Sequence, residues 1–289
     1  MEFDPYLYVA FLAGLVAGWV VRPRSAWVGR ATLATVGALV GLLGASLSGI
    51  PAGSLLATVP LALAYASLIL LLTALVYFVL ARRRVPGSTP PAGTTKPDGR
   101  VPLSLLLLGA LLAGYGLGHV LAVPTAEAIP WALYALLALV AFDLRLRTRA
   151  LGRLWVPLLA AVGGALGAAT VFIVLGEFSA PIALATALAF GWYTLAGPLV
   201  GARAGALLGL MAFLTNFLRE DLTMLLAPVF GRRLQGEGMS ALGGATSMDT
   251  TLYFVTRYGD AEAGSLALAS GLVLTVAASL LLPIVLALP

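Results

Sequence analysis

The chain has 289 residues, of which 61% are hydrophobic and only 10% are charged. A soluble α/β or β domain of this length does not have this composition, which indicates an all-α polytopic membrane protein in a lipid bilayer. The net charge of +5 comes from basic residues spread over short loops, which argues against nucleic-acid binding, and the lack of cysteine excludes disulfides, thiolate metal sites and cysteine nucleophiles.

Six apolar runs in the first part of the chain have about the 20 residues needed to cross a hydrocarbon core of about 30 Å. They are residues 6–21, 31–49, 55–80, 103–122, 128–144 and 154–175. The first four residues, MEFD, are acidic and lack the basic region of a signal peptide. We therefore expect the first run to stay in the protein as a helix.

The loops between these runs alternate in charge. The first, third and fifth loops contain the basic residues Arg22, Arg24, Arg30, Arg82, Arg83, Arg84, Lys96, Arg100, Arg145, Arg147, Arg149 and Arg153. The second and fourth loops, around 50–54 and 123–127, contain none. By the positive-inside rule the odd-numbered loops are predicted to be cytoplasmic and the N-terminus to lie outside.

The third loop, residues 85–100, is rich in Pro, Gly, Ser and Thr and predicts a flexible cytoplasmic linker. It separates two predicted three-helix membrane units, residues 1–84 and 101–176. Because each unit has an odd number of spans, a duplicated unit would sit inverted in the membrane. Residues 177–289 are predicted to form the C-terminal core, which begins on the outer side.

Within this core, residues 204–230 can cross the membrane with some tilt and end next to Arg232 and Arg233, which places that end in the cytoplasm. The window 181–202 must then enter and leave on the outer side as a re-entrant hairpin. The window 236–260, too polar and glycine-rich to span, is predicted to be its counterpart from the cytoplasm.

A last helix at 264–287 completes about eight transmembrane helices plus two opposed re-entrant hairpins, an inverted-repeat transporter architecture. The alternative is nine or ten full spans. Its best support is Arg203, which the hairpin arrangement leaves outside.

Three polar segments interrupt this apolar sequence: residues 190–197 (FGWYTLAG), 214–221 (LTNFLRED) and 243–251 (GGATSMDTT). The three consecutive charges of the middle segment are costly in lipid unless they face a protein interior or a water-filled path. The other two segments are rich in Gly, Ser and Thr, which let the backbone leave the helix and offer its polar groups to a ligand. Together they indicate an ion or substrate path.

These segments resemble the lysine exporter LysO family, whose pattern reads approximately G-F-G-W-Y-S-L-S-G, F-x-N-x-x-R-E and G-G-A-T-S-M-D-x-T-L-P. The chain matches it at residues 190–197, at Asn216, Arg219 and Glu220, and at residues 243–252. The resemblance is clear over roughly residues 180–289. It implies export of L-lysine, and because membrane-embedded acids are considered important in that family, it implies a transport role for Glu220.

Two positions depart from the family pattern. Ser46 and Ser48 lie at the end of the second helix, where bacterial members tend to have an acid, and Tyr253 replaces the proline of the third motif. The first departure leaves open the charge of the substrate and the identity of the coupling ion.

The candidate substrate and ion site is centred on Asn216 and Glu220, which are four residues apart and so share a helix face, and Thr223 extends this face. A carboxylate beside an amide can hold an ammonium or sodium ion, or carry a proton. For lysine, Glu220 is predicted to bind the side-chain ammonium and Asp249 the α-ammonium or a coupling cation. Arg219 is predicted to be a charge partner of Asp249 or Asp221.

The substrate carboxylate is predicted to accept hydrogen bonds from the backbone and hydroxyls of Thr246, Ser247 and Thr250. Trp192 and Tyr193 either contact the substrate or pack within the first hairpin. No metal site is expected, since the chain has a single histidine.

The leading hypothesis is a secondary transporter in the cell membrane that exports L-lysine and is coupled to inward movement of H⁺ or Na⁺, with no resident cofactor and no enzymatic activity. One alternative is a transporter of the same plan for another cationic amino acid or a small ion. A remote one is an intramembrane aspartyl enzyme that uses Asp221 and Asp249. A homodimer is compatible with close helix packing at Gly163, Gly164 and Gly167.

Overall fold

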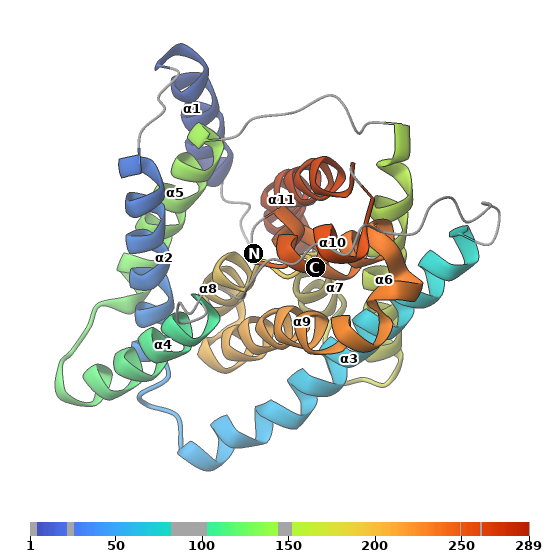
Figure 1. Cartoon of the computed structure of the whole chain (residues 1–289). Coiled ribbons are helices and arrows are strands. Elements are labelled where there is room, and N and C mark those ends of the chain that lie inside the picture. Colours follow the sequence, from blue (N-terminus) through green and yellow to red (C-terminus); the bar gives the residue numbers. More distant parts are fainter. Residues whose placement is uncertain are drawn as a thin grey trace.

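The computed structural model describes residues 5–21, 26–81, 103–143, 152–248, 250–260 and 262–288. All regular elements in these ranges are helices, which confirms the all-α prediction (Figure 1). The first six are α1 (Pro5–Val21), α2 (Ala26–Ser46), α3 (Ala52–Ala81), α4 (Leu103–Val120), α5 (Thr125–Asp143) and α6 (Trp155–Val174). Each coincides with one of the six apolar runs. The predicted linker 85–100 lies outside the described residues.

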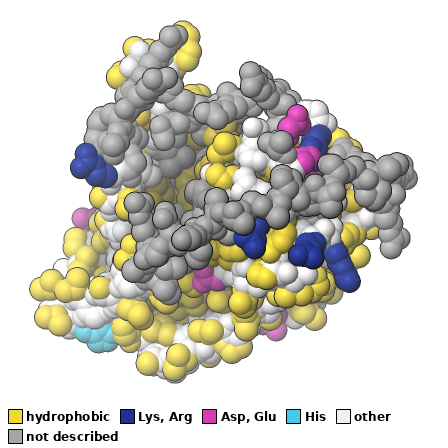
Figure 2. All heavy atoms as spheres, viewed as in Figure 1, with side chains coloured by type: hydrophobic (Ala, Val, Ile, Leu, Met, Phe, Trp, Pro, Cys, Tyr) yellow, Lys and Arg dark blue, Asp and Glu magenta, His cyan; other side chains and the backbone are white. Residues whose placement is uncertain are grey.

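The composition of these helices indicates a membrane protein. Among the described residues, α3, α6 and α11 (Ala263–Leu286) are long and apolar enough to cross a bilayer. Large apolar side chains are exposed on the outer helices, for example Trp19 of α1 (75%) and Leu71 of α3 (65%). Among the side chains that Figure 2 colours by type, hydrophobic ones predominate. This exposed apolar surface suits lipid contact.

The C-terminal part consists of shorter and interrupted helices. They are α7 (Ala180–Ala187), α8 (Tyr193–Ala204), α9 (Ala206–Gly243), the 3₁₀ helix η2 (Gly244–Met248), α10 (Leu252–Tyr258) and α11. The window 181–202 is thus two helices separated by a break at 188–192. Helix α9 continues beyond the expected end at 230 and changes direction at Gln235, whose φ is 54°. The window 236–260 consists of the end of α9, η2 and α10. Re-entry of either window from one side of the membrane stays a prediction.

The N-terminal helices pair between the two predicted units rather than within them. Helix α1 packs on α5, α2 packs on α4 and α5, and α3 lies along α6 and α9. In Figure 1 the first two pairs lie on one side of the C-terminal elements and the α3–α6 pair on the other. The C-terminal elements α7 to α11 are therefore flanked by helices from both units.

Small residues allow several of these helices to touch. A Cβ added at Gly209 of α9 would lie 2.6 Å from the Cα of Gly201 on α8, so the two backbones are in direct contact. The glycines of α6 pack inside the same chain. A Cβ at Gly164 would overlap Thr73 of α3, and Gly163 faces Val76 of the same helix. These α6 glycines thus mediate intrachain packing, and a homodimer stays a prediction.

Candidate functional site

The first break, between α7 and α8, contains two consecutive residues with positive φ. Phe190 has φ of 54° and Gly191 has φ of 94°. A positive φ is unfavourable for a bulky side chain and persists only where the surroundings hold it. Phe190 is fully buried, and its carbonyl accepts a hydrogen bond of 2.8 Å from the backbone N–H of Ala245 in η2. Tertiary contacts therefore stabilise this strained turn.

The two interrupted segments, residues 181–202 and 236–260, contact each other at this point through their backbones. Besides the Ala245 to Phe190 hydrogen bond, a Cβ at Gly191 would lie 3.3 Å from the carbonyl oxygen of Gly243. A Cβ at Gly244 would overlap the carbonyl oxygen of Phe190. The glycines are needed here because the backbones approach too closely for a side chain. Segments about 50 residues apart in the sequence thus form one junction, which we call the crossing.

Asn216 of α9 attaches the first break to the long helix. Its Nδ2 donates to the carbonyls of Thr186 (2.9 Å) and Ala212 (3.0 Å), and its Oδ1 accepts from the N–H of Gly191 (2.8 Å). Its side chain is fully buried. Because both amide hydrogens are already donated to backbone, Asn216 has a positioning role in this geometry. Direct contact of Asn216 with a substrate stays a prediction.

Arg219 and Glu220, one turn further along α9, are buried, with exposures of 0% and 2%. The Nη2 of Arg219 donates to the carbonyl of Ala241 at 3.3 Å, whereas Nε and Nη1 have no acceptor among the described residues. Residues two apart on a helix do not face each other, and the partnership of Arg219 with Asp221 stays a prediction. The other partner considered for it, Asp249, lies outside the described residues.

The hydroxyls predicted to bind a substrate carboxylate are engaged within the fold. Thr246 donates to the carbonyl of Gly243 (2.9 Å), and Ser247 donates to the carbonyl of Ala267 on α11 (3.0 Å). Thr223, which extends the face of Glu220, donates to the carbonyl of Arg219 (2.8 Å). Thr250 is half-buried in the turn before α10. In this arrangement the Thr246 and Ser247 hydroxyls fix the local backbone, and substrate contact stays a prediction for them.

The two adjacent aromatic residues of the first segment, Trp192 and Tyr193, lie in different environments. Tyr193 is buried and packs edge-on against Phe213 (centroid distance 5.4 Å) and Phe217 (5.7 Å) of α9. Trp192 is half-buried where α8 begins. The packing interpretation accounts for Tyr193, because edge-to-face contacts with two rings are a stabilising core arrangement.

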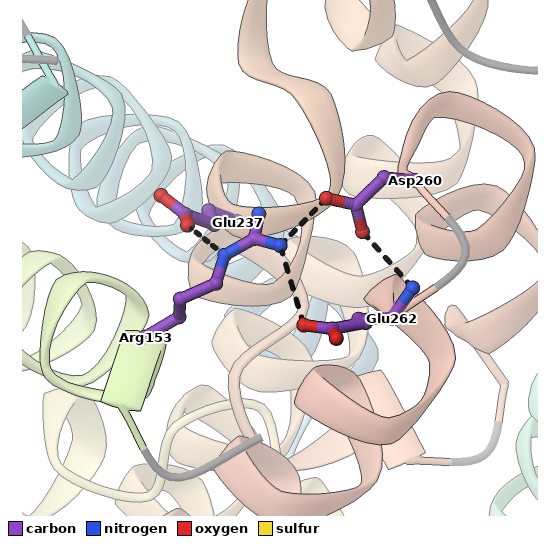
Figure 3. Close-up of polar contacts among 4 residues, drawn as sticks. All are labelled: Arg153, Glu237, Asp260 and Glu262. Carbon is purple, nitrogen blue, oxygen red and sulfur yellow. Dashed lines mark hydrogen bonds and ion pairs between the residues drawn. The ribbon is translucent and has the colours of Figure 1, made fainter. Parts of the chain in front are cut away.

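A second polar cluster, not expected from the sequence, lies away from the crossing (Figure 3). Arg153, just before α6, contacts Glu237 just past the Gln235 kink (Nε to Oε1, 2.7 Å) and Asp260 between α10 and α11 (Nη1 to Oδ2, 2.6 Å). Glu262 lies at 3.8 Å. We call these four residues the Arg153 cluster. From the sequence alone, Arg153 was interpreted only as a topology determinant. The one available signal for this cluster was Glu237, an isolated acid in a glycine-rich stretch.

The Arg153 cluster ties both ends of the second interrupted segment to α6. Burial lowers the pKa of the Arg153 guanidinium, but its hydrogen bonds with Glu237 and Asp260 outweigh this effect and raise that pKa above its ordinary value. The guanidinium therefore stays charged. The positive-inside rule predicts that the cluster lies on the cytoplasmic side.

We expect Arg153→Gln to lower the free energy of unfolding by about 1–3 kcal/mol, less than for a fully buried pair because Arg153 is partly exposed. The reason is that Glu237, whose side chain is only 9% exposed, loses its cation. Thermal unfolding of the detergent-purified protein measures this. Glu262→Gln is the control, since Glu262 is 66% exposed and lies at 3.8 Å. Equal melting temperatures for both variants would contradict the prediction.

Two cavities of the described residues lie away from the crossing, and both include Arg203 in their lining. One of about 400 Å³ is at the ends of α7, α8 and α11, and its lining includes Arg203 and Leu208. Arg203 also donates to the carbonyl of Leu286 at 3.2 Å. None of the predicted substrate-site residues lines this cavity. Among the described residues, no group of three or more His, Cys, Asp or Glu side chains is placed to hold a metal ion.

Comparisons with known proteins agree with the sequence resemblance. A family model described as "Lysine exporter LysO" matches residues 107–286. The Escherichia coli K12 protein "Lysine exporter LysO" is 39% identical over 105 residues, which are 36% of this chain and 33% of that protein. A Haemophilus influenzae protein, "Putative lysine exporter", is 31% identical over 99 residues, 34% of this chain and 50% of that protein. The matches thus span half or less of these curated relatives. No solved structure matches the chain.

Proposed function

This chain belongs to the lysine exporter LysO family, and from that premise we propose that it is a secondary transporter that exports L-lysine across the cytoplasmic membrane. The observation that carries the proposal is the crossing of two interrupted segments beside the buried Arg219 and Glu220. Interrupted helices and buried charges are costly in an apolar protein, and they are retained where they form a substrate or ion path.

The interrupted segments support a transporter architecture. In many secondary transporters, discontinuous helices from two opposed repeats meet near the bilayer midplane and form the substrate site. Here the break between α7 and α8 meets η2 through the Ala245 to Phe190 hydrogen bond. We propose that 181–202 and 236–260 are opposed re-entrant hairpins within a transport core at 177–289.

The pairing of the first six helices supports an inverted repeat of units 1–84 and 101–176. Helix α2 contacts α4 as α1 contacts α5, and α2–α5 and α3–α6 also pack together. Exchanging α1 with α4, α2 with α5 and α3 with α6 leaves this set of contacts unchanged. A two-fold relation between the two units would produce this set. The repeat therefore rests on packing as well as on the alternating loop charges.

In this proposal Glu220 supplies the negative charge for the side-chain ammonium of lysine, and inward movement of H⁺ or Na⁺ drives export. A buried carboxylate beside an ammonium ion is a charge-assisted pair, which is strong when water is excluded. The second candidate substrate is another cationic amino acid. It is favoured by Ser46, at the end of α2, whose Oγ donates to the carbonyl of Leu43 (2.7 Å) where bacterial members tend to have an acid.

Counterflow in proteoliposomes tests the proposal. Vesicles preloaded with unlabelled lysine should take up labelled lysine in a saturable manner, and a pH gradient or a sodium gradient imposed separately should identify the coupling ion. If arginine or ornithine is exchanged and lysine is not, the transporter proposal holds and the lysine assignment fails. Flux that never saturates would indicate a channel and would overturn the carrier mechanism.

A further inference from the structure

Arg219 is the largest fully buried side chain among the described residues, and most of its hydrogen-bonding capacity is unused. A guanidinium has five N–H donors. Among the described residues this one makes a single hydrogen bond, from Nη2 to the carbonyl of Ala241, which is long at 3.3 Å. Nε and Nη1 together contribute three N–H groups that meet no acceptor in the described part of the chain.

This degree of burial without a counter-charge is energetically unfavourable. No ion pair of Arg219 is found among the described residues, and the adjacent Glu220 leaves the helix in a direction that differs by about 100°. Buried charges are normally paired and hydrogen-bonded. An anionic group of a ligand would provide the counter-charge that the described residues do not supply to Arg219.

The guanidinium also lies at the crossing. Its Nη2 is 2.9 Å from the position that a Cβ at Gly244 would occupy, and Gly244 in turn touches the carbonyl of Phe190. Glycine at this position brings the backbone of both interrupted segments next to Arg219. A group bound by Arg219 would therefore contact both segments whose movement opens or closes the path.

We propose that Arg219 binds the α-carboxylate of the amino-acid substrate. The inference deepens the proposed function and rests on it, since it assigns one contact of the same substrate. The planar fork of arginine matches a carboxylate and forms two parallel charge-assisted hydrogen bonds with it. One turn of α9 then recognises both ends of lysine: Arg219 holds the carboxylate, and Glu220, in another direction, holds an ammonium group.

This assignment replaces the expectation that hydroxyls of the second interrupted segment bind the carboxylate. The hydroxyl hydrogens of Thr246 and Ser247 are donated to backbone carbonyls within the fold, whereas the Arg219 donors are not engaged. The assignment has a consequence for specificity. α-Amino acids with a cationic side chain should bind well, and diamines of the same length without a carboxylate should bind more weakly.

Competition between lysine and cadaverine tests this directly, since cadaverine is lysine without its carboxylate. Binding of labelled lysine to the purified full chain is measured with unlabelled lysine, cadaverine or lysinamide as competitor. The wild type should prefer lysine to cadaverine by roughly 10- to 100-fold, the effect expected for hydrogen bonds to a charged group. In Arg219→Gln this preference should disappear through weaker lysine binding, while cadaverine binding stays unchanged. Arg219→Lys should retain part of the preference.

A structural role for Arg219 gives different results. If Arg219→Gln weakens lysine and cadaverine equally, or if both Arg219→Gln and Arg219→Lys keep the wild-type preference, the carboxylate assignment is overturned. If the double variant Arg219→Gln/Asp249→Asn regains the preference, Arg219 only neutralises Asp249, and the assignment is likewise overturned. If Arg219→Gln fails to fold, Arg219→Lys, which keeps the charge, is the test. A partly retained preference for lysine supports the assignment, and a fully retained one overturns it.

The same design separates this inference from the lysine assignment. If the wild type binds arginine but not lysine, the experiment is repeated with arginine and agmatine, which is arginine without its carboxylate. Loss of that preference in Arg219→Gln would support the role of Arg219 while the lysine assignment fails. Lysine transport with an intact preference in the variant would leave the proposed function standing and refute the role of Arg219.

Discussion

Replacing Glu220 with Gln is expected to reduce lysine counterflow at least 100-fold while the protein still folds. Glu220 is 2% exposed on α9, next to Arg219 and close to the crossing. Gln has the same shape but cannot provide a negative charge for an ammonium ion, and the loss of one member of a buried charge pair costs about 3–5 kcal/mol, or roughly 100- to 1,000-fold or more in affinity.

The thermal stability of the Glu220→Gln protein should not fall along with its counterflow. Burying a neutral amide is less costly than burying a carboxylate, so the melting temperature of the Glu220→Gln protein should be equal to or higher than that of the wild type. Glu177→Gln is the matched control, because Glu177 is exposed after α6. It should leave both counterflow and melting temperature unchanged. Wild-type counterflow in Glu220→Gln would exclude Glu220 from the substrate site.

The second large effect is expected for Gly244→Ala, which should destabilise the protein by about 3–5 kcal/mol and abolish lysine binding. Gly244 has φ of 63° and ψ of −126°, a conformation open essentially to glycine alone. The added Cβ would also overlap the carbonyl oxygen of Phe190 and lie 2.9 Å from Nη2 of Arg219. Both effects act on the crossing.

Gly176→Ala separates these two contributions. Gly176 has a similar φ of 74°, but nothing lies within 4 Å of a Cβ built there. Its substitution should cost only the backbone term of about 1 kcal/mol and leave lysine binding intact. Thermal unfolding and binding of labelled lysine measure both variants. Similar melting temperatures for the two proteins would show that close backbone contact at the crossing does not matter for stability.

Much of the helical framework was predictable because it depends on local composition. The six apolar runs correspond to α1 to α6, and the glycine and proline content of 181–202 indicated that this window is not one continuous helix. Reasoning from glycine content also predicted that the next helix ends at 230, whereas α9 continues to a kink at Gln235. A helix end next to Gly231 was a weak inference, since an isolated glycine lowers helix propensity by only about 1 kcal/mol.

The candidate site was predictable in part. Buried charges in an apolar chain pointed to Arg219 and Glu220, and the four-residue spacing placed Asn216 on the same face as Glu220. Neither observation identified the groups to which these side chains form hydrogen bonds. Asn216 holds the backbone of Gly191 and Thr186, and Arg219 has donors without acceptors among the described residues. These distinctions depend on which carbonyls lie within 3 Å of a side chain.

The sequence by itself determined that this protein is helical and apolar, where its first six helices run and that Arg219 and Glu220 are buried, because these properties follow from periodicity and transfer free energies within about 20 residues. Only the tertiary structure decided which elements meet. The pairing of Arg153 with Glu237 across 84 positions, the packing of the α6 glycines against α3, and the contact of Phe190 with Ala245 all depend on backbone approach between distant segments. Local patterns contain no information on that approach, since hydropathy specifies that a face is buried and not what buries it.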